Sequence, residues 1–94
     1  MFDKQRYLTK GVNVSISSEL QLFMWECVAA MPDPKDYLQV FRLSVSDGKQ
    51  IVAHEQEEPE YKKEYRLNIG SPINNKVYVI DNSDYSTMLL AEEY

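Results

Sequence analysis

The sequence predicts an α+β domain of two layers, in which one main helix packs on one face of a mostly antiparallel sheet of four to six strands. Three observations carry this prediction. One stretch, 20–31, has the apolar spacing of an amphipathic helix, several shorter stretches alternate with the period of a strand, and turn-forming residues separate them. The expected element order is β-α-β-β-β-β, and the sequence leaves undecided whether a further strand follows at the end.

One domain spanning residues 1–94 accounts for the length and the composition. Hydrophobic residues make up 44% of the 94 and charged residues 27%, which excludes disordered and collagen-like chains. Ten basic and fifteen acidic side chains leave a net charge of −5. This charge repels phosphate backbones and anionic lipids, so we expect neither nucleic acid nor a membrane among the partners.

The cysteine content and the first residues both indicate a cytoplasmic protein. Cys27 is the only cysteine, so no intramolecular disulfide can form, as expected for a reducing compartment. Residues 1–10 carry four charged side chains and no apolar block, which is unlike a signal peptide.

The first half of the chain holds a short strand and the main helix. Residues 7–12 are typical of a short strand that runs into a loop ending at 15–18. Apolar residues then recur with helical spacing over about three turns. This stripe consists of Leu20, Phe23, Met24, Cys27, Val28 and Met31.

Both ends of the helix carry recognisable signals. Ser18, with Gln21 three residues later, matches a capping box and is the preferred N-cap, and Ser17 is the alternative. Pro32 ends the helix, because proline lacks the N–H donor and disfavours helical geometry in the residue before it.

A β-hairpin follows the helix. The hydrophobic period changes to two, and the residues predicted to share one face are Tyr37, Phe41, Leu43 and Val45. Asp47 and Gly48 form a pair that tolerates positive φ at both central positions of a type I′ turn. The register that a two-residue turn predicts is Val45 opposite Gln50, Leu43 opposite Val52 and Phe41 opposite His54.

Three further strands are expected after the hairpin. Residues 54–60 are too charged, and too interrupted by Pro59, for an interior strand and should form a solvated turn or edge. In 61–67, tyrosines and a leucine alternate with charged residues, as on a strand with one wet face. Residues 77–80 are typical of a central strand, and 85–90 fit a last strand or a helical turn, of which we favour the strand.

No residue pattern predicts a catalytic, cofactor or metal site, so we do not expect an enzyme. Cys27 falls on the apolar stripe, where a buried thiol behaves as a small hydrophobe. His54 is the only histidine and is expected beside an aromatic residue of the hairpin, so a dyad with Cys27 is not favoured. The acidic run 55–60 lacks the alternating ligands and the glycine of a calcium loop.

The strand at 61–67 does not predict a nucleic-acid surface. Tyr61 and Tyr65 alternate with Lys62 and Arg66, so the rings and the cations lie on opposite faces of the strand. A stacking platform for single strands needs both on one face.

A second apolar stripe on the helix, which consists of Leu22, Trp25 and Ala29, is the candidate partner-binding site. One interpretation is that the segment 85–90 covers Trp25 inside the domain. The other is that the stripe is an exposed patch for a protein partner, with Trp25 as its anchor, because tryptophan is enriched among interface hot spots.

These observations favour a non-catalytic module that binds a protein partner or itself. A first alternative is a small-ligand binder or minor enzyme that uses a tyrosine-lined pocket on the sheet. A second alternative is an acidic protein that occupies a nucleic-acid-binding protein, since the chain carries a net charge of −5.

Four segments resemble a known family across nearly the whole chain. They read RYLTKGV at 6–12, ELQLFMW at 19–25, DYLQVF at 36–41 and EEY at 92–94. They are similar to the domain of unknown function nine-sixty, a family of small proteins of Gram-positive bacteria and their mobile elements. The resemblance implies a small bacterial cytoplasmic protein and implies no activity, cofactor or site residue. It also gives the second alternative its form, an acidic mobile-element protein that occupies a nucleic-acid-binding protein.

Overall fold

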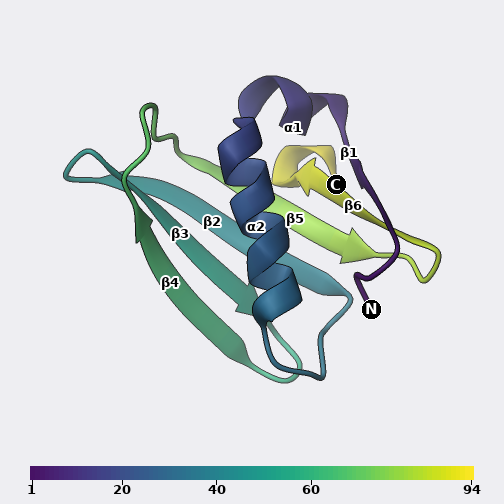
Figure 1. Ribbon diagram of the computed structural model, residues 1–94. Helices are drawn as coiled ribbons and strands as arrows, with labels where there is room; N and C mark the ends of the chain where they lie inside the picture. Colours follow the sequence, from purple (N-terminus) through teal and green to yellow (C-terminus); the bar gives the residue numbers. More distant parts are fainter.

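The computed structural model describes residues 1–94 and consists of a six-stranded mixed sheet with one long helix against one of its faces (Figure 1). The strands are β1 (Gln5–Leu8), β2 (Leu38–Ser46), β3 (Lys49–Gln56), β4 (Tyr61–Leu67), β5 (Asn75–Asp81) and β6 (Tyr85–Leu90). The helices are α1 (Lys10–Ser15), α2 (Ser18–Ala30) and the 3₁₀ helix η1 (Ala91–Glu93). The expected α+β class with one main helix is confirmed.

The strand order places β4 and β1 at the two edges of the sheet. The order is β1-β6-β5-β2-β3-β4, with β1 parallel to β6 and every other neighbouring pair antiparallel. The run expected to be a central strand lies in β5, which pairs with β2 and β6, and the last segment forms the strand that we favoured. The sequence did not indicate the strand order.

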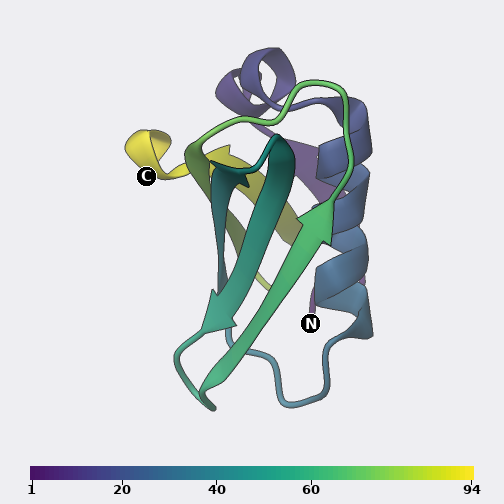
Figure 2. The same cartoon turned by 90° about the vertical axis from the view of Figure 1, so that its left-hand side faces the viewer.

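Helix α2 buries its apolar stripe against the sheet. Leu20, Met24, Cys27 and Val28 are buried, and Phe23 is half-buried at the side of a core cluster of 15 residues. Figure 2 shows α2 on one side of the sheet and η1 on the other, so the second sheet face carries no long helix. None of the helices is long and apolar enough to span a membrane.

The β2–β3 hairpin has the predicted turn and register. Asp47 and Gly48 both have positive φ, 50° and 73°, as a type I′ turn requires. The three pairs that the sequence predicted are found: Val45 with Gln50, Leu43 with Val52 and Phe41 with His54.

The segment after β1 forms a helix where we expected a loop, and β1 spans 5–8 rather than 7–12. Thr9 caps α1 by accepting a hydrogen bond from the Val12 N–H at 3.3 Å. The Thr9 hydroxyl in turn donates to the Glu93 carboxylate at 2.6 Å, and Val12 is fully buried. Residues distant in sequence therefore stabilise this six-residue helix, which is too short to form on its own propensity.

The prediction that Ser18 caps the main helix is wrong by one residue. Ser17 is the cap and accepts from the Leu20 N–H at 3.2 Å. Gln21 donates instead to the Ile16 carbonyl at 2.8 Å, so its side chain ties α2 to the end of α1 rather than closing a capping box.

Tyr37 does not share the face of Phe41 as predicted. Strand β2 begins only at Leu38, so strand alternation does not reach back to Tyr37. Tyr37 is exposed and, with Leu38, lines a hollow on the sheet face opposite α2.

Replacing Val28 with Asp should destabilise the domain by several kcal/mol, because it buries a charge with no partner in the α2–sheet contact. Urea unfolding measures the change. Ala29→Asp is the matched control, since Ala29 is exposed one residue further along α2, and it should cost well under half as much. Equal losses would contradict the burial of this stripe.

Replacing Gly48 with Val should cost about 1–2 kcal/mol of stability, because a β-branched residue at φ +73° is strained. Gly70→Val is the control, since Gly70 has no positive φ and a Cβ there meets nothing within 4 Å. The two variants are compared by thermal unfolding, and an unchanged Gly48→Val midpoint would contradict the turn.

Candidate functional site

The three residues of the predicted partner-binding stripe lie in different environments. Leu22 is 57% exposed and Ala29 is exposed, but Trp25 is only 7% exposed and belongs to the core cluster. The guanidinium of Arg6, on β1, lies 5.0 Å from the centre of the Trp25 ring. Of the two interpretations of this stripe, burial of Trp25 inside the domain is therefore the one that the structure shows, with Arg6 of β1 over its ring, and the interpretation of Trp25 as an exposed anchor is wrong.

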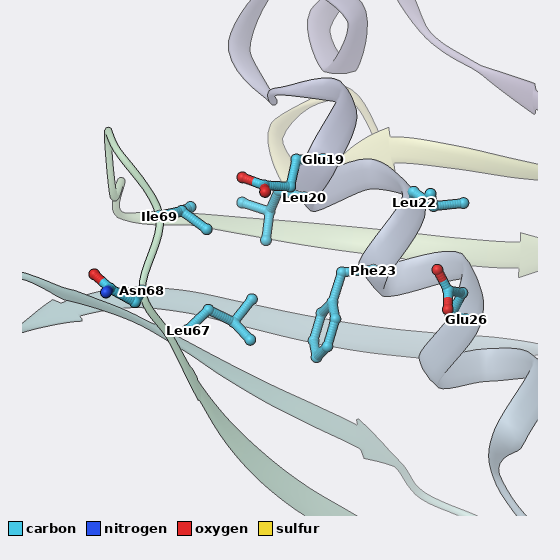
Figure 3. A pocket seen from close by; sticks show the side chains of 8 residues that line it. All are labelled: Glu19, Leu20, Leu22, Phe23, Glu26, Leu67, Asn68 and Ile69. Carbon is cyan, nitrogen blue, oxygen red and sulfur yellow. The ribbon is translucent and has the colours of Figure 1, made fainter.

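An apolar groove opens beside the exposed Leu22, between α2 and the end of β4 (Figure 3). It has a volume of about 360 Å³. Eight residues line it: Glu19, Leu20, Leu22, Phe23, Glu26, Leu67, Asn68 and Ile69. Of the predicted site residues, the structure brings Leu22 alone into this groove.

Helix α2 and strand β4 supply the two walls of the groove. In Figure 3 the Phe23 ring is directed from α2 toward Leu67. The ring also packs edge-on against Tyr65, with 5.1 Å between ring centres. The predicted alternation of 61–67 placed Tyr65 and Leu67 on one face, but no signal in the turn-rich segment indicated that Ile69 would join them.

The rim of the groove is acidic. Glu19 and Glu26 lie seven residues apart on α2, so they flank the groove from the same side of the helix. Neither carboxylate forms a salt bridge. An apolar floor with two free carboxylates at its rim favours a ligand that is apolar and positively charged.

The free edge of β4 borders the same groove. Strand β4 ends the sheet and pairs with β3 alone, so the backbone groups on its outer side have no partner strand. An extended chain added to this edge would project alternate side chains toward α2.

The sheet face opposite α2 has a smaller hollow of about 270 Å³. Its walls include Tyr37 and Tyr78, as well as the cations Arg42 and Lys76, and three carboxylates also line it. His54 lies on the helix side of the sheet, stacked on Phe41 at 4.4 Å between ring centres, so it contributes nothing to this tyrosine-lined hollow.

Cys27 has no feature of an activated nucleophile. Burial raises the pKa of the Cys27 thiol to about 11, and a hydrogen bond with Tyr65 offsets only part of this rise. The side chain is 5% exposed and lies on the buried stripe as predicted. No group of three or more His, Cys, Asp or Glu side chains is placed to hold a metal ion.

His54 belongs to a buried polar network at the other end of the core. Its Nε2 donates to Oε1 of Gln39 at 2.7 Å, because Gln39 uses its amide nitrogen to donate to Gln56, also at 2.7 Å. His54 Nδ1 is buried without a partner. Desolvation lowers the pKa of His54 to about 4, so the imidazole is neutral at pH 7.

Taken together, the fold and the groove define a small α+β domain that carries an apolar, acid-rimmed groove beside a free sheet edge. The chain belongs to the family described as Staphylococcal protein of unknown function (DUF960), which matches residues 5–93. The resemblance stated from the sequence is thereby confirmed.

A solved structure shares this fold. It is described as the crystal structure of the protein of unknown function from Enterococcus faecalis, and it is 24% identical to this chain with a TM-score of 0.87. The match covers 98% of this chain and 92% of that chain. No curated protein matches this chain.

The burial of His54 predicts an acid-dependent loss of stability. The folded pKa, about 4, lies below the ordinary value of 6.5, so the unfolded chain binds the proton more readily and stability falls as the pH drops from 6.5 to 4. The loss from this group should be roughly 2–3 kcal/mol between pH 7 and pH 4.

Urea unfolding of the native chain and of His54→Phe at several pH values measures this contribution. Phenylalanine keeps an aromatic ring on Phe41 but cannot be protonated, so the stability difference between the two proteins should change with pH in this window. Parallel pH profiles would show that His54 does not titrate as the structure indicates.

Proposed function

We propose that this protein is a non-catalytic protein-binding module, which takes an extended segment of a protein along the β4 edge with side chains in the groove against α2. The observation that carries the proposal is the apolar groove lying directly beside an unpaired strand edge. In strand addition, backbone hydrogen bonds give affinity and pockets for alternate side chains give specificity. Both elements are present here on one side of the molecule.

The charge of the groove narrows the chemistry of the segment. Glu19 and Glu26 at the rim favour a segment with Lys or Arg, and the floor formed by Leu20, Phe23 and Leu67 favours apolar residues at alternate positions. An apolar floor with charged groups at the rim matches the usual arrangement of a protein interface, which has a hydrophobic core and a polar rim.

The state of the two side chains best suited to covalent or acid–base chemistry supports a non-catalytic role. Burial moves the pKa of Cys27 up to about 11 and that of His54 down to about 4, so neither group is poised near neutral pH. The groove itself is lined by five hydrophobic side chains, two carboxylates and one amide.

Selection of peptides from a random displayed library tests the proposal. We expect the selected peptides to carry alternating apolar residues with Lys or Arg, and to shift the backbone NMR signals of β4 and α2. Leu22→Lys should weaken binding at least tenfold, because it removes apolar surface and adds a cation beside the groove. Val14→Lys, on the exposed face of α1, is the matched control and should leave affinity within twofold.

The proposal fails if the library yields no binding peptide. It also fails if the selected peptides bind Leu22→Lys as well as they bind the native chain, or if the NMR shifts lie away from β4.

A further inference from the structure

We propose that the segment which occupies the β4 edge is β4 of a second copy of this chain, in antiparallel pairing centred on Tyr65. This inference rests on the proposed function and names its partner. It is argued from the charges along β4, which reads YKKEYRL, and from the geometry that a closed two-fold dimer imposes.

A two-fold axis that pairs β4 antiparallel with its own copy must stand perpendicular to the sheet. The residues on the α2 side of the two copies then lie on one face of the joined sheet. The residues on the side opposite α2, which we call the open face, lie together on the other face. The register is therefore centred on a residue of β4, and each choice of centre can be judged by the side chains that it places opposite one another, about 5 Å apart.

Registers centred on Tyr61 or Leu67, at the two ends of β4, leave most of the two strands unpaired. The registers centred on Lys62, Lys63, Glu64 and Arg66 each bring like charges together. In each of them the central residue faces its own copy, and centring on Glu64 also sets Lys62 opposite Arg66. Like charges directly opposite on a sheet are destabilising.

Centring on Tyr65 places opposite charges, rather than like charges, across from one another. Glu64 of each copy faces Arg66 of the other, which forms two symmetric ion pairs on the open face of the joined sheet. Arg66 has no salt bridge within its own chain, and neither has Glu64, so both are free for this pairing. The two Tyr65 rings meet at the centre of the helix side.

The same register also brings a positive charge to the acidic groove. It places Lys63 of the second copy opposite Leu67, which is the β4 wall of the groove. Lys63 lies on the helix side of β4, where its ammonium is 5.3 Å from the centre of the Tyr65 ring in its own chain. This cation then reaches the side of the groove whose rim is formed by Glu19 and Glu26.

The dimer should be a weak one. Pairing of two seven-residue strands with one groove on each side buries an area at the low end of specific interfaces, so we expect dissociation in the micromolar range. Sedimentation equilibrium of the full chain from 5 to 500 µM should show conversion from one to two copies within that range.

Charge reversal and charge exchange test the register. Glu64→Arg alone, or Arg66→Glu alone, makes both central pairs like-charged and should weaken the dimer at least tenfold. The double variant Glu64→Arg with Arg66→Glu restores opposite charges in the same register and should recover affinity to within threefold of the native chain. Asp84→Arg, in the β5–β6 connection, is the control for a change of net charge and should leave the dimer intact.

Circular dichroism and thermal unfolding of each variant show whether the fold is kept. A native chain that stays monomeric at 500 µM overturns the inference, and so does a double variant that folds but does not recover the dimer. If the chain is monomeric while library peptides still bind along β4, the dimer fails and the proposed function stands. If neither the peptides nor a second copy bind at β4, both fail.

Discussion

The contact between the apolar stripe of α2 and one face of the sheet is the constraint on which the remaining structure depends. A helix of 13 residues is about 20 Å long and about 10 Å wide, whereas six strands span about 24 Å from edge to edge. One helix therefore cannot cover the face. Helix α1 lies beside β6 on one side, and Arg6 of β1 lies over Trp25. On the other side no further helix packs beside α2, and the uncovered strip of the sheet along β4 forms the groove.

The same shortage of cover explains the polar network around His54. Beyond the end of α2, the sheet face carries Gln39, His54 and Gln56, where an apolar side chain would be expected under a longer helix. Gln56 accepts from the Asp36 N–H at 2.8 Å and donates to the Pro59 carbonyl at 2.8 Å. These side chains form hydrogen bonds with backbone groups of the loops that close this end of the core. The polar network thus covers the part of the sheet face that α2 does not reach.

Features fixed by neighbouring residues could be predicted from the sequence, and features fixed by distant ones could not. The hairpin register follows from Asp47 and Gly48 alone, and the α2 stripe follows from its own spacing. Helix α1 depends on Glu93, which reaches Thr9 from the other end of the chain. The cap at Ser17 is the exception among the local features, because the capping-box pattern rested on Gln21, whose side chain donates to the Ile16 carbonyl instead. The apolar surplus of α2 was visible in the sequence, but which part of it stays exposed depends on where β1 joins the sheet.

The charges on β4 have two consequences for an edge strand. Charged side chains at a sheet edge normally deter pairing with other chains, because a chance register sets like charges opposite one another. On the open face of β4 a carboxylate, Glu64, stands between the cations Lys62 and Arg66. This order penalises the registers centred on Glu64 and on Arg66 but not the one centred on Tyr65. The pattern that protects the edge from unspecific pairing is thus also the pattern that favours the proposed register centred on Tyr65 over its immediate neighbours, and this preference comes from the order of the charges along the strand rather than from their number.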